Sequence, residues 1–553
     1  IRRPPRSTLD RSSAASDVYK RQVEDIVKSW IEPVNKMSRT SQPLSNLKIA
    51  LQCGGSDAFS GVSGNPLAAY VAKEVIRHGG SANLAETDEL IGAESYVLQN
   101  VSSIEVARKF LSTVERFQEK ASWHGHTAEG NPSGGNNFRG LYNIAIKSIG
   151  AAMKRHPDVR LDHVIEYGEP MHDAGYYFMA SPGNDLESIA GQVAAGSNII
   201  FFVTGNGSIT NFPFVPTIKI VTTTDRYNLL KKDMDVNAGA YQDGEPMEKL
   251  GTSMLNLTVE IASGTPSIGE EAGHSQVSIW RNWQQNDASN TDQILNAPKP
   301  DGQPISVSTS KSSNRNFLAI QTQNGNKTDQ IGLVLPTSLC SGQIAQLITK
   351  KLNQQKLGRN RGISRFVALA HTEGCGASGG SSERLYAQTL IGHLVHPIVG
   401  LGVLLEHGCE KTHNDYIKND LAQLGINSKK YGWASVQLDG GIDAVTQKIE
   451  QWFNQSVADL EDLTYSQGSL RDLNIGLMSI GKITSRVASD LADFTQTIIG
   501  EGGTIVIPQN ASLLESFNYT TEVIGNQDWN CLLYTSDAAD ERSSVDLGGR
   551  RII

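Results

Sequence analysis

The chain has 553 residues, a formal net charge of −9 and 39% hydrophobic residues, so it can form several domains that each bury a core. The acidic balance and the lack of a basic run argue against nucleic acid or an anionic membrane as partner. No run of about 18 apolar residues occurs, which excludes a membrane-spanning helix. The five cysteines lack metal-knuckle spacing and do not suggest a disulfide scaffold, so a reducing cytoplasm is the expected location.

Both ends of the chain, residues 1–22 and 531–553, are predicted not to be native protein sequence. Residues 18–22 can be encoded by a DNA element whose reverse complement, read one base later, encodes residues 531–535. The pair resembles a transposon-type sequencing adapter that flanks an insert in opposite orientations. We therefore expect native sequence only within residues 23–530, open at both ends.

Residues 53–61, Cys-Gly-Gly-Ser-Asp-Ala-Phe-Ser-Gly, are the segment most typical of a functional site. The pattern predicts a strand over residues 47–51 before this segment and a helix over residues 66–78 after it. Glycines at such a turn let the backbone approach a ligand closely, and a helix N-terminus favours an anion. The alternative is a tight turn that Ser56 and Asp57 cap in the ordinary way.

Short apolar strands alternate with helical stretches in the rest of the chain, which predicts a multi-domain α/β protein with mostly parallel sheets flanked by helices. The clearest predicted elements are strands over residues 82–85, 198–203 and 216–221 and helices over residues 186–195 and 246–263. Residues 286–315 are rich in Asn, Ser, Pro and Asp, which is typical of a linker.

An internal duplication is also predicted, because residues 445–453 parallel residues 23–31 and residues 473–481 parallel residues 47–55. The second copy keeps the apolar positions and loses the polar ones. The polar pairs that differ are Cys53 and Ser479, Ser56 and Lys482, Asp57 and Ile483, and Glu86 and Gln509. A copy that keeps its core and drops its polar cluster is typical of a structural unit, so the comparison favours Cys53, Ser56, Asp57 and Glu86 as a catalytic site.

The motifs resemble those of the altronate and galactarate dehydratase family over about residues 47–285. The matching segments, in the family's order, are residues 51–61 with Asn65-Pro66, residues 131–136, residues 202–208 and residues 235–239. Residues 337–340, 371–376, 396–397 and 408–410 are similar to the family's central domain, which usually precedes the Cys53-type domain and here follows it. The resemblance implies a cytoplasmic, metal-dependent hydro-lyase acting on sugar acids, with iron(II), or alternatively manganese(II) or an iron–sulfur cluster.

These observations divide the chain into seven parts. They are an adapter segment 1–22, a helical lead-in 23–46, a catalytic-type C-terminal domain 47–285, a linker 286–315, a central-type domain 316–440, a truncated degenerate repeat 441–530 and a second adapter segment 531–553.

Dehydration of a 2,3-dihydroxy acid removes the C2 proton and expels the C3 hydroxyl, so the site needs a base, an acid and a group that stabilises the enediolate. Asp57 and Glu86 are the candidate metal ligand and general base, although Glu86 is alternatively a solvated glutamate after a strand. Cys53 is either a soft iron ligand or a packed small residue.

Further polar residues on predicted loops suit a polyhydroxy carboxylate, with Arg139 as its bidentate clamp. The candidate substrate-binding residues are Ser60, Asn65, Asn131, Ser133, Asn136, Arg139, Thr204, Lys219, Asp235 and Asn237. Lys219 either pairs with the substrate or points to solvent from an edge strand; Asp235 and Asn237 either bind metal or substrate or cap a turn. Weaker metal candidates are His371, Cys375, Cys409 and Glu410, joined by Cys340 in a three-cysteine cluster, against the alternative of buried structural cysteines.

Two departures from the family pattern affect the predicted function. The family loop usually continues with two lysines and two glycines, where this chain has residues 137–140, Asn-Phe-Arg-Gly, and Ile146 stands where a glutamate usually precedes Lys147. They favour a second hypothesis, a non-catalytic sugar-acid-binding or scaffolding homologue. A third is elimination of another group, such as sulfite from a sulfonated lactate. The expected partner is a small-molecule sugar acid, with no nucleic acid and no membrane; a homo-oligomer is left open.

Overall fold

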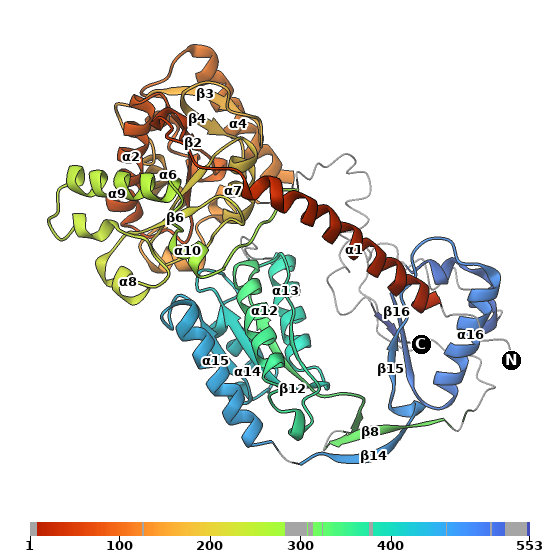
Figure 1. The fold of residues 1–553 in the computed structure, drawn as a ribbon. Coiled ribbons are helices and arrows are strands. Elements are labelled where there is room, and N and C mark those ends of the chain that lie inside the picture. The colour runs from red at the N-terminus through yellow and green to blue at the C-terminus, as the bar shows by residue number, and fades with distance from the viewer. Residues whose placement is uncertain are drawn as a thin grey trace.

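The computed structural model shows an α/β protein in which three blocks of secondary structure follow one another along the chain (Figure 1). We refer to residues 44–281 as the first block, residues 331–458 as the second block and residues 470–525 as the third block. The predicted linker lies almost wholly outside the described residues. The structure describes residues 8–123, 126–281, 307, 313, 315–322, 325–374, 380–460, 462–508, 511–525 and 550–552.

The first block is built on a seven-stranded parallel sheet with strand order β3-β4-β2-β1-β5-β6-β7. Strand β1 pairs with β2 on one side and with β5 on the other, so the strand order reverses direction at β1. In parallel sheets of this kind, ligands bind in the crevice beyond the carboxyl end of such a strand, which here ends at Cys53. The strands are β1 (Lys48–Cys53), β2 (Ser81–Leu84), β3 (Leu161–Ile165), β4 (Gly175–Met179), β5 (Ile199–Thr204), β6 (Thr217–Val221) and β7 (Val236–Asn237).

Helices cover both faces of this sheet, which explains why its strands are almost continuously apolar. Along β1, Ile49 and Leu51 pack with one layer and Ala50 packs with the other, because successive side chains alternate between faces. The first layer contains α2 (Asn65–Arg77), α4 (Ile104–Trp123), α6 (Ile144–Ala152) and α9 (Met247–Ala262), and the second contains α7 (Asp185–Ala194). The strands and helices predicted in this block are confirmed to within two residues at each end. Its shorter helices are α3 (Glu94–Val97), α5 (Gly134–Phe138), α8 (Thr224–Leu229) and α10 (Ile268–Glu271).

The second block repeats this layering on a four-stranded parallel sheet, ordered β11-β10-β12-β13. Its strands are β10 (Ile331–Pro336), β11 (Phe366–Ala368), β12 (Val399–Glu406) and β13 (Gly432–Ser435). Helices α12 (Leu339–Gln354) and α15 (Gly441–Ala458) pack on one face, and α13 (Gly380–Leu394) and α14 (Asn414–Gln423) pack on the other.

The third block has the local order of the β1–α2–β2 unit. Its strands β15 (Asn474–Gly476) and β16 (Thr504–Pro508) pair in parallel across α16 (Ser485–Gly500), and α17 (Phe517–Ile524) completes its core. Strand β17 (Arg550–Ile552) pairs antiparallel with β16. Strands β8 (Asn316–Thr322) and β9 (Gly325–Lys327), which precede the second block, and β14 (Thr464–Ser469), which follows it, form a separate antiparallel sheet.

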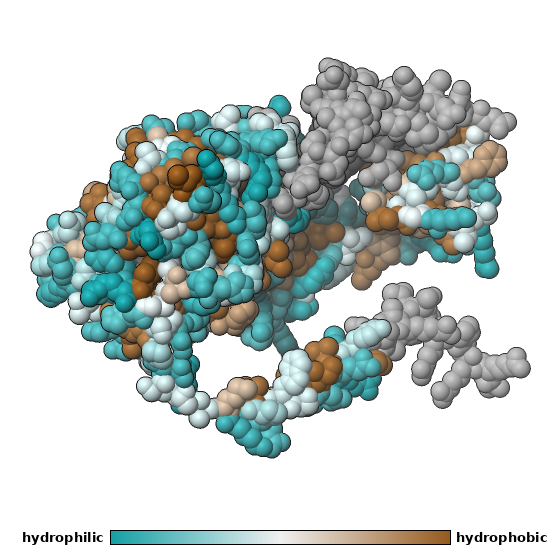
Figure 2. Space-filling model, turned by 90° about the horizontal axis from the view of Figure 1, so that it is seen from above, coloured by the Kyte–Doolittle hydropathy of each residue, from teal (hydrophilic) through white to brown (hydrophobic). Residues whose placement is uncertain are grey.

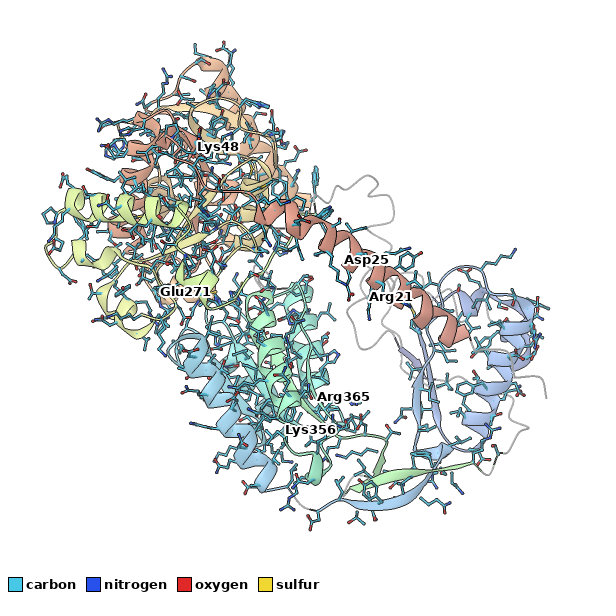
Figure 3. The ribbon with its side chains drawn as sticks, in the orientation of Figure 1. Arg21, Asp25, Lys48, Glu271, Lys356 and Arg365 are labelled. Atoms are coloured by element: carbon cyan, nitrogen blue, oxygen red, sulfur yellow. The ribbon has the colours of Figure 1, made fainter. Side chains whose placement is uncertain are left out.

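Helix α1 (Thr8–Asn35) extends from the first block toward the third, and Arg21 and Asp25 lie on the stretch between them (Figure 3). Hydrophilic and hydrophobic residues are interspersed on the face of the first block seen in Figure 2. Among the helices that the structure describes, none combines the length and the apolar character that a membrane crossing requires.

The first two blocks share one hydrophobic core. Ile209, Val221, Leu230 and Met234 of the first block pack in the same cluster as α12, α15 and the sheet of the second block. Leu230 is 1% exposed, and one of its methyl groups lies 3.6 Å from the position of a Cβ on Gly441. Burial of these side chains therefore holds the two blocks together.

We expect Leu230→Ala to weaken the association of the two blocks, since it removes a buried side chain from their shared core. The loss should be about 2–5 kcal/mol of unfolding free energy, measured by urea denaturation. Leu229→Ala is the matched control, because the neighbouring Leu229 is 47% exposed. Equal destabilisation by both variants would contradict a shared core.

Candidate active site

A cavity of about 400 Å³ lies between the first and second blocks, at the carboxyl ends of the first block's strands. It is lined by Gly54 and Gly55 after β1, by the residues after β2, and by the loop around Asn131. The second block contributes Cys340, Cys409, Glu410 and Lys411. The cavity therefore depends on both blocks, and Lys411 Nζ links them by donating to the Gly130 carbonyl at 2.9 Å.

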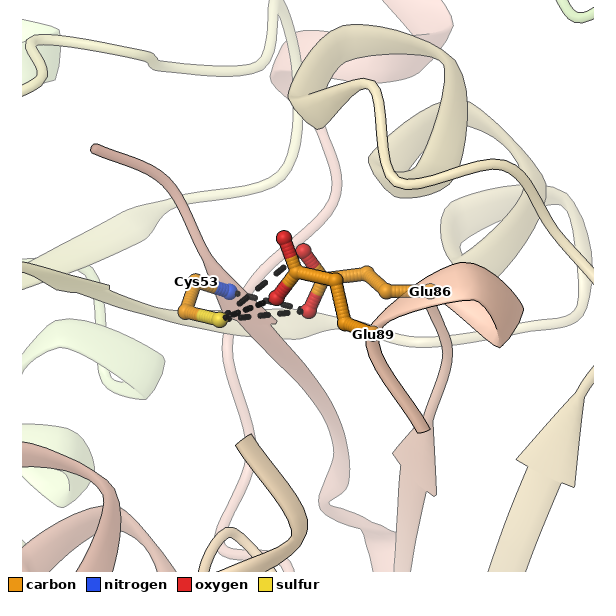
Figure 4. A group of neighbouring side chains, drawn as sticks. All are labelled: Cys53, Glu86 and Glu89. Atoms are coloured by element: carbon orange, nitrogen blue, oxygen red, sulfur yellow. Dashed lines mark hydrogen bonds between the residues drawn. The ribbon is translucent and has the colours of Figure 1, made fainter. Parts of the chain in front are cut away.

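Three buried side chains, Cys53, Glu86 and Glu89, converge below this cavity (Figure 4). The Cys53 thiol donates to Glu89 Oε2 at 3.0 Å, and the Cys53 backbone N–H donates to Glu86 Oε2 at 3.2 Å. Glu86 is 0% exposed, so its interpretation as a solvated glutamate is wrong. Cys53 and Glu86, two of the four residues that the repeat comparison grouped as a site, are thus in direct contact.

Two buried lysines face these carboxylates. Lys154 Nζ forms an ion pair with Glu86 and donates to Cys53 Sγ at 3.1 Å, while Lys147 Nζ lies 2.7 Å from Glu89 Oε1. The two lysines are seven residues apart, about two helical turns, so α6 and the turn after it present both on one side. A Cβ on Gly61 would lie 2.7 Å from Gly150 Cα, so only glycine lets α6 pack this closely against the turn that follows β1.

Glu86 has a strained backbone conformation. Its φ of 67° and ψ of 69° lie in the left-handed region, which non-glycine residues seldom adopt. Ser181 Oγ accepts a hydrogen bond from the Glu86 N–H at 2.8 Å, and Gln52 Nε2 donates to its carboxylate at 2.5 Å. Strain of this kind persists where the surroundings hold a side chain in place for function.

Burial and charge move the pKa values of this cluster apart. Burial and the nearby Glu89 raise the pKa of Glu86 well above its usual range. Burial alone would raise the pKa of Glu89 as well, but the ammonium groups of Lys147 and Lys154 outweigh it and lower that pKa. Burial would lower the pKa values of both lysines, yet the surrounding acids raise them, so both lysines stay protonated. Paired groups with separated pKa values are typical of acid–base catalysis.

Two further carboxyl groups line the cavity and titrate near neutral pH. Burial and the charge of Glu89 raise the pKa of Asp88 to about 6 and that of Asp185 to about 7. Asp88 accepts a hydrogen bond from Asn131 Nδ2 at 2.8 Å, and Asp185 is the first residue of α7. An acid with a pKa near the working pH can both take and return a proton.

Several residues predicted from sequence lie at the cavity. Asn131, Ser133 and Asn136 line it, and Lys147 Nζ donates to Asn131 Oδ1 at 2.6 Å. Ser133 caps α5 through the Asn136 N–H, and Asn136 Nδ2 donates to the Ser56 carbonyl at 2.7 Å. The loop therefore fixes the turn after β1 and the cavity wall together.

Asp57 does not join the Cys53–Glu86–Glu89 cluster. Its carboxylate accepts hydrogen bonds from Thr222 Oγ1 at 2.9 Å and from Ser60 Oγ and the Phe59 N–H, each at 3.1 Å. These bonds hold the turn, which is the capping role that the sequence left as the alternative, and the structure does not bring Asp57 and Glu86 to one metal site.

The remaining first-block candidates form internal bonds away from the cavity lining. Thr204 Oγ1 accepts from the N–H groups of Gly207 and Ser208, and Asn65 Nδ2 donates to the Gly150 carbonyl at 2.7 Å. Asn237 Nδ2 donates to Thr224 Oγ1 at 3.0 Å.

Lys219 and Asp235 are neighbours. Lys219 is 2% exposed on β6, between β5 and β7, so its interpretation as a solvent-facing lysine on an edge strand is wrong. Asp235 accepts from the Lys219 N–H at 2.8 Å and from the Ile268 N–H at 3.0 Å, so it ties β6 to the first turn of α10.

The weaker metal candidates of the second block are only partly brought together. Cys409 and Glu410 line the cavity, but Glu410 accepts from three backbone N–H groups, those of His407, Gly408 and Cys409. His371 Nε2 lies 2.9 Å from the Pro336 carbonyl. Cys375 lies outside the described residues.

A divalent metal does not fit the donors that do converge. Cys53, Glu86 and Glu89 each have a ligand atom within 4.8 Å of the others, which makes them a group of three potential ligands among the described residues. However, Lys154 and Lys147 already neutralise the two carboxylates, and burial together with Glu86 and Glu89 raises the pKa of the Cys53 thiol. A dication would add uncompensated charge beside two buried ammonium groups.

Asp88, Glu89, Lys147, Lys154 and Asp185 are functional candidates that sequence reasoning missed. The sequence did carry a signal for the two lysines. Lys147 and Lys154 lie two turns apart on an otherwise apolar helix and its continuation, a spacing that places both on one side. Asp185 carries no such signal, since only the packing of α7 brings it to the end of β1.

The fold and cavity define a class: α/β proteins with a buried acid–base site between two parallel-sheet domains. Family comparison is more specific. The D-galactarate/altronate dehydratase C-terminal domain matches residues 44–285, and the D-galactarate dehydratase/altronate hydrolase second domain matches residues 330–461. The chain belongs to the D-galactarate/altronate dehydratase family.

Named relatives align with just under half of this chain. Altronate dehydratase of Bacillus subtilis (strain 168) is 33% identical over 257 residues, covering 46% of this chain and 51% of the relative. Galactarate dehydratase (L-threo-forming) of Escherichia coli (strain K12) is 30% identical over 268 residues, covering 47% and 51%. The beta subunit of (2R)-sulfolactate sulfo-lyase of Chromohalobacter salexigens is 25% identical over 257 residues, covering 46% and 66%. The chain thus spans about half the length of the dehydratases it matches.

We expect Lys154→Met to destabilise the protein strongly, because it leaves Glu86 buried without its cation. The loss should be about 3–5 kcal/mol in urea denaturation, whereas Lys73→Met, at a partly exposed ion pair, should cost under about 1 kcal/mol. Adding Glu86→Gln to Lys154→Met should recover part of the loss, since the uncompensated charge is removed. A single variant as stable as Lys73→Met would rule out a structural role for the pair.

Proposed function

We propose that this protein is a hydro-lyase that removes water from a sugar acid and yields a 2-keto-3-deoxy acid. The observation that carries the proposal is the buried acid–base cluster that opens onto one cavity at the carboxyl edge of the sheet. Membership of the D-galactarate/altronate dehydratase family, with relatives named for dehydration of altronate and galactarate, supports the same reaction.

The cavity residues suit the two halves of an elimination. Asp185, with a pKa of about 7, takes the proton from C2 of the substrate. Lys147, held cationic by Glu89, stabilises the negative charge that develops on the carboxylate as the enediolate forms. The C3–O bond then breaks, the proton on Asp185 passes to the departing hydroxyl, and water leaves. The enol that remains tautomerises to the ketone.

Iron(II), manganese(II) and an iron–sulfur cluster stay predictions from the family resemblance. Because the Cys53–Glu86–Glu89 donors do not fit a dication, no step above uses a metal. Metal analysis of protein prepared anaerobically with iron(II) measures whether the protein binds iron, and stoichiometric iron would require either other ligands or displacement of the two lysines.

We expect turnover of aldonic or aldaric acids, measured as 2-keto-3-deoxy product in anaerobic assays with and without iron(II). Asp185→Asn should lower kcat/KM about 100-fold or more, because the base is lost. Asp158→Asn is the control, since the Asp158 carboxylate is 73% exposed. Iron-loaded protein that turns over no acid in the panel would favour the binding or scaffolding hypothesis.

The pH dependence of kcat/KM should reflect the ionisation of Asp185. A general base acts when it is ionised, so kcat/KM should rise with pH through an apparent pKa near 7, the value that burial and Glu89 give Asp185. The residual rate of Asp185→Asn should lack this rise. A wild-type profile that is flat from about pH 5 to pH 8 would exclude Asp185 as the base.

A further inference from the structure

A second polar cluster adjoins the cavity where Gly55, Gly135 and Cys409 meet. A Cβ on Gly135 would lie 3.1 Å from Cys409 Cα and 3.2 Å from Asn206 Nδ2. A Cβ on Gly55 would lie 3.3 Å from Ser208 Oγ and 3.4 Å from Asn206 Nδ2. Because Gly55 and Cys409 line the cavity, Asn206 and Ser208 lie in contact with its wall.

Asn206 and Ser208 are buried without hydrogen-bond partners. Both are 0% exposed, and within the described part of the chain neither amide atom of Asn206 nor the hydroxyl of Ser208 has a partner. An unpaired buried polar group costs about 1–3 kcal/mol, so such groups are normally satisfied by a ligand or an ordered water. Together they offer three donor hydrogens, two on the Asn206 amide and one on the Ser208 hydroxyl, and their oxygens as acceptors.

Two half-buried arginines belong to the same cluster. Arg226 Nη1 donates to the Gln437 carbonyl at 2.9 Å, and Arg139 Nη1 donates to the Gly135 carbonyl at 3.4 Å. Within the described residues neither guanidinium has a carboxylate within ion-pair distance. Arg226 Cδ lies 3.7 Å from the position of a Cβ on Gly207, which stands between Asn206 and Ser208. Both arginines therefore border the same polar groups, and burial and then the charge of Arg139 lower the pKa of Arg226.

The carboxylate of Asp57, whose charge acts on both arginines, does not neutralise this pair. Asp57 raises the pKa values of both arginines, but its oxygens accept hydrogen bonds from Thr222, Ser60 and Phe59 instead. One carboxylate facing two guanidinium groups leaves one positive charge over. Arginine presents a planar fork of donors that matches an oxyanion such as a carboxylate or sulfonate.

We propose that Arg139 and Arg226, with Asn206 and Ser208, bind a second anionic group of the substrate, so that the enzyme takes a dianionic hydroxy acid in preference to a monoacid. The proposal rests on the proposed function, because the first carboxylate is the one beside Lys147. Arg139 lies in the loop where this chain departs from the family pattern, whereas Asn206 and Ser208 lie in a segment that matches it. The shared ligand chemistry is an oxyanion at the far end of the substrate, either the second carboxylate of an aldaric acid or a sulfonate.

The first experiment compares KM and kcat for an aldaric acid, an aldonic acid and sulfolactate in wild type, Arg139→Gln and Arg226→Gln. KM for the dianionic substrate should rise about tenfold or more in either variant, and by clearly more than KM for the aldonic acid. Arg116→Gln is the matched control, because Arg116 is 43% exposed in its ion pair with Glu166. Equal loss for monoacid and diacid would overturn the proposal.

The second experiment measures binding without turnover, through the shift in Tm on adding tartrate or glycolate. Tartrate should stabilise wild type more than glycolate does, and the difference should vanish in Arg139→Gln but persist in Arg116→Gln. If tartrate binding depends on the arginine but no acid is turned over, the proposed subsite stands and the proposed hydro-lyase activity is wrong. If tartrate raises the Tm of Arg139→Gln as much as that of wild type, the proposed subsite is wrong. Preferential turnover of sulfolactate over aldaric acids would identify the sulfonate as its occupant.

Discussion

The structure around the cavity depends on neutralising two buried carboxylates with two buried ammonium groups. Glu86 with Lys154 and Glu89 with Lys147 carry no net charge together, which is the condition for keeping all four out of water. The pairing also sets the chemistry. The pairing keeps both lysines cationic and leaves Glu89 ionised. Burial and the negative charge of Glu89 then raise the pKa values of Asp88 and Asp185 toward neutrality. The strained backbone at Glu86 is consistent with a side chain held for this purpose.

The second block completes the site without supplying its acid–base cluster. It closes the cavity with Cys340, Cys409 and Lys411, and its shared core with the first block holds these residues in place. Along the chain, the block of the C-terminal-domain type precedes the block of the second-domain type. The cavity nevertheless forms between them, because docking depends on complementary surfaces such as those at Leu230 and Gly441 and not on the order of connection.

Much of the α/β framework could be predicted from the sequence. Strands such as residues 199–204 are continuous apolar runs because helices cover both faces of the sheet, and residues 53–61 stand out because a strand delivers glycines and polar side chains to one turn. The repeat comparison also grouped Cys53 and Glu86 with Ser56 and Asp57 as one site, and Cys53 and Glu86 are in contact. It could not separate Asp57 from them, since neighbours in a turn share a motif even when their side chains point to different partners.

By itself, the sequence determined the class of fold, the family and the turn after β1, because periodicity and local motifs are properties of neighbouring residues. The tertiary structure alone decided which charges meet. Asp185 comes to the end of β1 through the packing of α7, Lys154 reaches Glu86 across 68 positions of chain, and Arg226 comes to lie beside Gly207. Electrostatic interactions act through space and are strongest where water is excluded. Their outcome is therefore fixed by packing between elements that are distant along the chain.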